Sequence, residues 1–178
     1  ISLFLFYSTF VFSFDTTAKS AILYDETTNS VLFEKFADLP LPPASMSKLM
    51  TLLLTFEALQ EKRISLSTKF RVSEKASKKG GSTMFLEKNQ LVSVEDLIKG
   101  ISVVSGNDAC IVIAEGLSGT EESFVERMNL KAKDLGLLNS NFDNSTGWPS
   151  PQHAMSVRDL LKIATILKNE YLSYYKYF

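Results

Sequence analysis

The sequence predicts an α+β fold, in which a β-hairpin near the N-terminus is followed by a series of helices. Two short apolar runs, 20–24 and 31–35, flank a polar turn, which is the pattern of an antiparallel hairpin. Further along, apolar residues recur at helical spacing, and several of these segments begin with a capping residue. A length of 178 residues and a hydrophobic content of 45% suit one domain or part of a larger one.

The first segment, residues 1–14, is an uncharged run of Leu, Phe, Ile, Val, Ser, Thr and Tyr. This composition is typical of the apolar core of a signal peptide, and the run is too short to span a bilayer comfortably. We therefore expect residues 1–17 to be an incomplete signal peptide, and the protein to be exported to the periplasm or the cell envelope. A buried strand or an incomplete membrane anchor is the alternative.

The most apolar helix is expected to begin at or just before Ser45, because Pro42 and Pro43 end any earlier element. From Met46 to Leu59, apolar residues fall nearly all round the helix rather than along one stripe. Such a pattern predicts a central, buried helix.

Ser45 and Lys48 are three residues apart, so the lysine amine can reach the serine hydroxyl on one face of this helix. Burial would lower the pKa of Lys48 toward that of a working base. The backbone N–H of Ser45 points where an oxyanion could form. The alternative is a capping serine and a surface lysine. The same spacing recurs at Ser173 and Lys176, in an aromatic tail that gives it no support.

Four further helices are expected, and three of them have recognisable caps. A capping box at Ser93 opens a helix that should end at Gly106, and another apolar helix begins at Asp108. Thr120 caps a helix that ends at Gly136, and a last capped helix follows residues 156–159.

Ser105 and Asn107 therefore lie on a tight connector between two buried helices, where polar groups need partners. They could simply satisfy backbone groups of a turn. Together with Ser45 and Lys48, however, they complete the nucleophile, base and second hydroxyl of a penicillin-recognising serine enzyme.

At this point the chain resembles the low-molecular-weight penicillin-binding proteins that act as serine-type D-alanyl-D-alanine carboxypeptidases, peptidase family S11. The likeness runs from about Ala18 to about Leu167 and is carried by the segments 41–48, 81–86, 100–110 and 142–160. It implies a β-lactamase/transpeptidase-like fold, with an antiparallel sheet, flanking helices and a mainly helical insertion at 64–147. Residues 18–178 would be part of that domain.

The resemblance also implies a role for each motif residue. Ser45 would attack the carbonyl between the terminal D-alanines of a peptidoglycan pentapeptide stem, and Lys48 would take its proton. Ser105 would relay a proton to the departing amine, and Asn107 would hold the substrate amide and hydrogen-bond to Lys48. β-Lactam antibiotics would acylate Ser45 as covalent inhibitors.

One element of that family is missing, because the sequence contains no Lys-Thr-Gly triplet. The nearest match, Asn144–Gly147, has no cation and comes too early. By resemblance, we expect the triplet, the remaining sheet strands and a possible inner-membrane anchor to lie beyond Phe178, so that this sequence is a C-terminally truncated piece. Since one lost oxyanion donor costs on the order of 10²–10³ in turnover, the piece alone should have very low activity.

Two other functions stay open. A β-lactamase of the same superfamily is disfavoured because the sequence has no Glu-x-x-Leu-Asn element, and the rate of penicillin release would distinguish it. A non-catalytic wall-binding module would fail to be labelled by penicillin at Ser45.

Composition excludes several other classes. A formal net charge of −1 gives no reason to expect nucleic acid. With one cysteine and one histidine, an internal disulfide is impossible and a zinc cluster is not expected; we predict no metal and no cofactor. Cys110 is interpreted as a buried hydrophobe. His153 precedes a capped helix, which disfavours a role in a triad with Ser45.

A small basic cluster, Lys75, Lys78 and Lys79, stands beside Gly80–Gly81. We interpret it as a solvated loop near the site entrance, with contact to an anionic wall polymer as the alternative. Trp148 is interpreted as a packing anchor, because nothing in the sequence assigns it to substrate.

Overall fold

The computed structural model describes residues 16–178. The run at 1–14, on which the signal-peptide prediction rests, lies outside the described residues. In the described part of the chain, no helix is long and apolar enough to cross a membrane.

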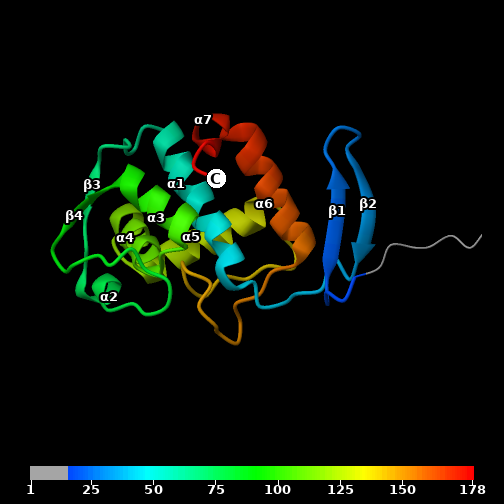
Figure 1. Cartoon of the computed structure of the whole chain (residues 1–178), viewed down its shortest axis with the longest axis horizontal. Helices are drawn as coiled ribbons and strands as arrows, with labels where there is room; N and C mark the ends of the chain where they lie inside the picture. Colours follow the sequence, from blue (N-terminus) through cyan, green and yellow to red (C-terminus); the bar gives the residue numbers. More distant parts are fainter. Residues whose placement is uncertain (1–15) are drawn as a thin grey trace, which may run out of the picture.

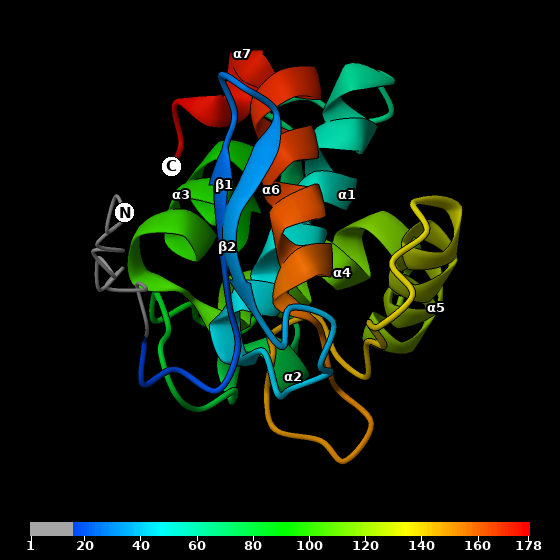
Figure 2. The same cartoon turned by 90° about the vertical axis from the view of Figure 1, so that its right-hand side faces the viewer.

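The predicted hairpin is confirmed. Strands β1 (Ala21–Asp25) and β2 (Ser30–Lys35) pair antiparallel, with an irregularity after Leu23. Asp25 closes the turn, since its carboxylate accepts hydrogen bonds from the Thr27 amide at 2.8 Å and the Thr28 hydroxyl at 2.7 Å. Figure 1 shows the hairpin at one end of the molecule, and Figure 2 shows it across the face of helix α6 (Val157–Glu170).

Ion pairs tie the hairpin and the segment after it to α6. Arg158 pairs with Glu34 and with Asp38, at 2.7 Å each, and Lys168 pairs with Glu26. These are exposed pairs, which contribute little each. The hairpin itself keeps apolar side chains in solvent: Leu23, Val31 and Leu32. The pairing of this hairpin with further strands of a larger sheet stays a prediction.

The central helix is α1 (Lys48–Gln60), which packs against α3 (Val94–Val104), α4 (Asn107–Ser118), α5 (Glu121–Asp134) and α6. Most of its side chains are buried, as the all-round apolar pattern predicted. One detail differs, because a 3-10 turn, η1 (Ala44–Ser47), precedes the α-helix. Side chains three residues apart eclipse one another in a 3-10 turn, which favours the meeting of Ser45 and Lys48.

The helix starts follow the predicted caps. The hydroxyl of Ser93 accepts from the Asp96 amide, that of Thr120 from the Ser123 amide, and that of Ser156 from the Asp159 amide. Two of these helices end two residues before the glycines that were expected to end them, at Val104 and Asp134. Gly136, with φ at 63°, lies just outside α5, whereas α3 is ended by Ser105 in the left-handed conformation and Gly106 is already the N-cap residue of α4.

Small elements complete the fold: β3 (Lys69–Arg71), α2 (Glu74–Ser77), β4 (Leu91–Ser93) and α7 (Leu172–Tyr175). Strands β3 and β4 pair antiparallel in a second small sheet. Elements of three or four residues carry no detectable periodicity, so the sequence did not predict them. Most of them fall within 64–147, but the division of the chain into a helical insertion and a sheet part stays a prediction.

Candidate active site

The structure brings Ser45 and Lys48 into contact. Lys48 Nζ donates a hydrogen bond of 2.9 Å to Ser45 Oγ. The serine is exposed on η1, whereas the lysine is 4% exposed. A reactive hydroxyl is thus accessible to a substrate, while its partner amine is shielded from water.

Burial determines the charge state of this lysine. Desolvation holds the pKa of Lys48 below its usual value of 10.5, and the positive charge of Lys79 lowers it further. Cys110 lies in the same region, but burial raises the pKa of its thiol to about 12, so that it is uncharged near neutral pH. A lowered pKa favours the neutral form of the amine, and in that form an amine 2.9 Å from a hydroxyl is suited to accept its proton.

Ser105 is the third group of this arrangement. It ends α3 in the left-handed conformation, with φ at 56°, and its buried Oγ has no hydrogen-bond partner among residues 16–178. Ser105, Ser45 and Lys48 line one cavity of about 320 Å³, together with Phe178. A buried hydroxyl without a partner that lines the cavity beside a serine–lysine pair is available for proton transfer.

Asn107 lies on the other side of Ser45, in a second cavity of about 210 Å³ that contains Ser45 but not Lys48. Its Nδ2 donates to the Gly80 carbonyl at 2.9 Å, and its backbone N–H donates to the Ser82 carbonyl at 2.7 Å. In the part of the chain that the structure describes, no hydrogen bond joins Asn107 to Lys48, contrary to our expectation. The amide instead fastens the 80–82 segment against the site.

Sequence reasoning missed Asp108, the next residue along α4. Its buried carboxylate accepts from the backbone N–H groups of Met84 and Leu86 at 3.1 Å, and from that of Ala109 at 2.8 Å. Asp108 therefore holds the 82–86 segment beside the cavity of Asn107. An acidic residue in the first turn of a helix was the available signal, but the amides of Met84 and Leu86 that it binds are more than 20 residues away.

The Asn144–Gly147 segment was also undervalued. Asn144 Oδ1 accepts from three backbone amides, those of Thr146, Gly147 and Trp148, which closes a tight turn. Gly147 has a φ of 81°, and a Cβ there would overlap the carbonyl group of Ala44. This turn consequently packs directly on the backbone that precedes Ser45.

A buried polar network joins the turn at 144–147 to helices α5 and α1. Glu121 Oε1 accepts from the Ser145 amide at 3.0 Å and from its hydroxyl at 2.7 Å, while Oε2 pairs with Lys75 at 2.9 Å. The Ser145 carbonyl in turn accepts from the hydroxyl of Thr51 on α1, at 2.7 Å. These hydrogen bonds hold the pKa of Glu121 below its usual range although burial opposes the charge.

Replacement of Glu121 by alanine is expected to lower the free energy of unfolding by about 2–4 kcal/mol, because the buried Ser145 amide and hydroxyl lose their acceptor. Glu122→Ala is the matched control. Glu122 pairs with the same Lys75 but its side chain is 75% exposed, so a change within about 0.5 kcal/mol is expected. Urea unfolding curves measure both, and equal losses in the two variants would contradict the network.

Other candidates do not join this site. His153 Nδ1 accepts from the Asp143 amide at 3.2 Å, and its ring packs edge-on against Phe142. No hydrogen bond among the described residues joins it to Ser45. Burial keeps the pKa of His153 below its usual value. Within residues 16–178 there is also no cluster of side chains that could hold a metal ion.

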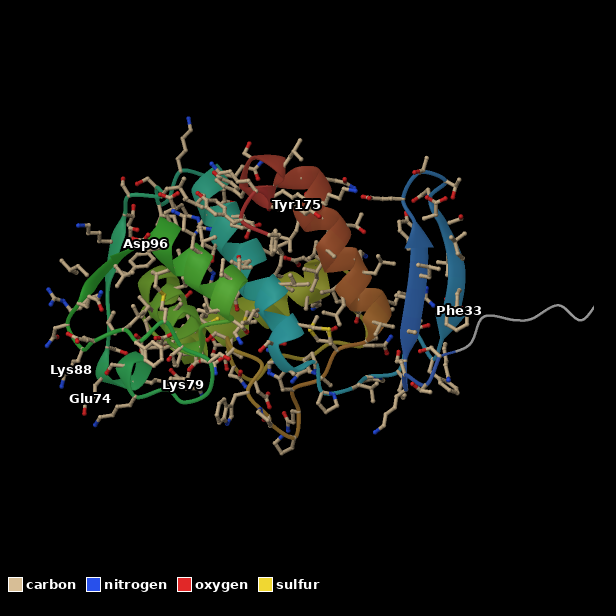
Figure 3. The ribbon with its side chains drawn as sticks, in the orientation of Figure 1. Phe33, Glu74, Lys79, Lys88, Asp96 and Tyr175 are labelled. Atoms are coloured by element: carbon tan, nitrogen blue, oxygen red, sulfur yellow. The ribbon has the colours of Figure 1, made fainter. Side chains whose placement is uncertain are left out.

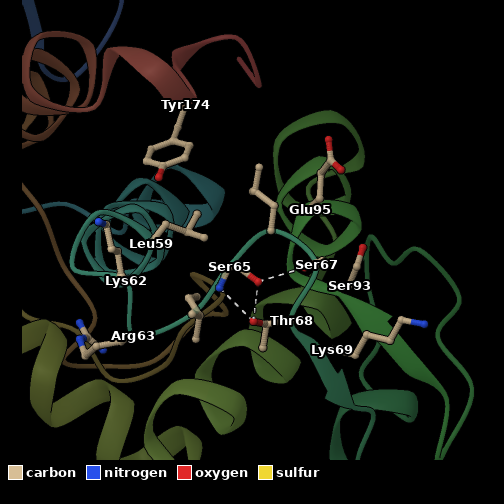
Figure 4. A pocket seen from close by; sticks show the side chains of 12 residues that line it. Leu59, Lys62, Arg63, Ser65, Ser67, Thr68, Lys69, Ser93, Glu95 and Tyr174 are labelled. Atoms are coloured by element: carbon tan, nitrogen blue, oxygen red, sulfur yellow. Dashed lines mark hydrogen bonds between the residues drawn. The ribbon is translucent and has the colours of Figure 1, made fainter.

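A larger cavity, about 940 Å³, lies elsewhere, between the end of α1, the 62–68 segment and β4. Figure 4 shows that the hydroxyl of Ser65 forms hydrogen bonds there with the hydroxyls of Ser67 and Thr68. Since these hydroxyls are already satisfied and no lysine in the cavity hydrogen-bonds to a serine, this cavity lacks the chemistry found at Ser45.

The fold and the serine–lysine pair place the protein in the class of transpeptidase-like proteins of mixed α/β structure. Comparison with known proteins agrees. The sequence matches the family described as D-alanyl-D-alanine carboxypeptidase, Peptidase_S11, over residues 8–178. The chain belongs to this family, as the resemblance of its motifs indicated.

Among similar proteins, D-alanyl-D-alanine carboxypeptidase DacF of Bacillus subtilis is 46% identical over 157 residues, which cover 88% of this chain and 39% of the relative. DacC of Escherichia coli is 38% identical, covering 84% of this chain and 39% of DacC. The crystal structure of penicillin-binding protein 5 from Haemophilus influenzae superposes with a TM-score of 0.90 at 34% identity, covering 94% of this chain and 50% of that one. The chain thus spans about two fifths of the length of these curated relatives.

Proposed function

We propose that the protein is a serine-type D-alanyl-D-alanine carboxypeptidase that removes the terminal D-alanine from peptidoglycan pentapeptide stems. The observation that carries the proposal is the 2.9 Å contact between Lys48 Nζ and Ser45 Oγ, with the amine buried and the unpartnered hydroxyl of Ser105 in the same cavity. Because the chain spans 39% of DacF and of DacC, the activity is proposed for the protein encoded by the complete gene.

The proposed reaction has two steps. Ser45 Oγ forms a bond to the carbonyl carbon between the terminal D-alanines, and its proton moves to Lys48. The carbon–nitrogen bond to the last residue then breaks, and the proton passes through Ser105 to the leaving amine. Water attacks the resulting ester, which releases the shortened stem as a carboxylic acid and restores the Ser45 hydroxyl.

We also propose that β-lactams are covalent inhibitors, because Ser45 can attack their carbonyl carbon as it attacks that of the stem peptide. Their strained amide presents a carbonyl to Ser45, but the leaving nitrogen stays attached to the acyl group. We further propose that the protein is exported and acts at the cell envelope, where its polymeric substrate lies. The uncharged composition of residues 1–14 supports export.

A fluorescent penicillin tests this function. The protein encoded by the complete gene should be labelled covalently, and Ser45→Ala should abolish the label. Ser173→Ala is the matched control, because Ser173 begins the second Ser-x-x-Lys pattern but lies exposed on α7, and no hydrogen bond among residues 16–178 joins it to Lys176. Labelling that survives in Ser45→Ala, or no labelling of the unsubstituted protein, would contradict the proposal. Release of the penicillin within a second would indicate a β-lactamase instead.

A further inference from the structure

The two cavities beside Ser45 differ in what they offer a substrate. On one side, Lys48 and Ser105 stand among apolar side chains of α1 and α3. On the other side, the lining is made by the polar groups of Ser82 and Asn107 and by the turn at 146–149. If Ser105 delivers the proton to the leaving amine, the terminal D-alanine leaves on its side. The rest of the stem then crosses the cavity of Asn107.

Trp148 forms the outer wall of that second cavity. Its side chain is still 44% exposed, so one part of the ring faces solvent. The other part packs against the backbone of Gly81, which has no side chain. A Cβ at Gly81 would lie 3.0 Å from Trp148 Cζ3 and 2.8 Å from Asn107 Nδ2. Gly81, with φ at 81°, thus allows the indole and the Asn107 amide to meet at one point of the rim.

A single cation stands over this indole. Lys79 Nζ lies 4.4 Å from the centroid of the Trp148 ring, which is a favourable cation–π distance. The half-buried Lys79 differs from its neighbours in the basic cluster: Lys75 pairs with Glu121, and Lys78 pairs with Glu74 at 2.5 Å. No ion pair or hydrogen bond from a described residue engages the Lys79 ammonium.

The position of Lys79 also matters electrically. Its positive charge is one of the causes that lower the pKa of Lys48, so Lys79 lies close enough to the reaction site to act on that amine. In the view of Figure 3, Lys79 lies apart from Glu74 and Lys88, which are close together at one end of the molecule. An unpaired cation at the rim of a cavity attracts anionic groups of a bound molecule more strongly than a paired one.

We propose that Lys79 and Trp148 form a specificity site for the acyl-donor part of the substrate. In this site the indole face supports the chain next to the scissile bond, and the ammonium binds a free carboxylate carried by that chain. The inference rests on the proposed function, because it takes Ser45 as the acylated residue. It adds that this enzyme prefers acyl donors with a carboxylate on that side over neutral ones.

Two penicillins with the same nucleus test this preference, one with a neutral arylacetyl side chain and one that carries a carboxylate on the same side chain. The second-order rate of acylation is measured for each in the protein encoded by the complete gene. The ratio of the anionic to the neutral rate should fall about fivefold in Lys79→Gln and further in Lys79→Glu. Because both rates depend on Lys48 alike, the ratio cancels the effect of Lys79 on that base.

Lys78→Gln is the matched control, since that charge is already paired with Glu74 and the ratio should not change. Trp148→Leu should slow acylation by both penicillins while it leaves the ratio largely intact. Raising the salt concentration should lower the ratio of the unsubstituted protein and not that of Lys79→Gln. A ratio that Lys79→Gln leaves unaltered, in a protein that still reacts with the neutral penicillin, overturns this inference alone. Failure of the unsubstituted protein to react with either penicillin overturns the proposed function as well.

Discussion

Replacement of Gly147 by alanine is expected to destabilise the protein by about 3–5 kcal/mol and to reduce acylation of Ser45 strongly. Two effects combine. The residue has a φ of 81°, a region that costs an L-residue roughly 1–2 kcal/mol. In addition, the new Cβ would overlap the Ala44 carbonyl group and lie 2.7 Å from Ser47 Oγ. The overlap involves backbone, so it can be relieved only by moving the turn that carries Ser45.

Gly119→Ala separates the two effects. Gly119 has nearly the same φ, 82°, but a Cβ there would meet nothing within 4 Å. This control should therefore show only the conformational cost of a positive φ, without a clash and with an unchanged acylation rate. Urea unfolding and penicillin acylation are measured for both variants. Equal losses of stability, or a normal acylation rate in a folded Gly147→Ala protein, would show that the turn does not position Ser45.

This contrast also shows which parts of the molecule the sequence could predict. The hairpin, the buried helix α1 and the caps at Ser93, Thr120 and Ser156 all depend on residues a few positions apart, and they form as predicted. The meeting of Ser45 with Lys48 is likewise local, because one helical turn brings them together.

What the sequence could not predict depends on contacts between distant segments. The packing of Gly147 on Ala44 joins residues that are more than 100 positions apart, and the bond from Thr51 to Ser145 joins two that are nearly as distant. The contact of Asn107 is a third case, because the sequence did not indicate that its amide nitrogen donates to the Gly80 carbonyl, 27 residues away.

The basic cluster gives a further example of this limit. Three lysines within five residues look equivalent in a sequence and suggested one solvated loop. In the fold, α2 turns them in different directions: Lys75 meets Glu121 of α5, Lys78 meets Glu74 one turn earlier, and Lys79 stacks on Trp148. The three lysines therefore differ in their contacts, because their partners come from different elements.

The other large effect is expected at Lys48. Lys48→Ala should lower the rate of penicillin acylation about 10²–10⁴-fold, because Ser45 loses its base. Lys48→Arg should be no better, since a guanidinium stays protonated and cannot accept the serine proton. Lys176→Ala is the control, because this exposed lysine follows Ser173 at the same spacing and no hydrogen bond among the described residues joins the two.

The pH dependence gives a second test of the same base. A protonated Lys48 cannot take the proton of Ser45, so acylation should be slow at low pH and rise as the amine loses its proton. Because burial, and secondarily Lys79, lower the pKa of this amine, the rise should be centred below the usual lysine value of 10.5. In Lys79→Gln one of the two causes is removed, so the rise should move to higher pH. A pH profile that is identical in Lys79→Gln, or substantial activity in Lys48→Arg, would show that another group accepts the proton.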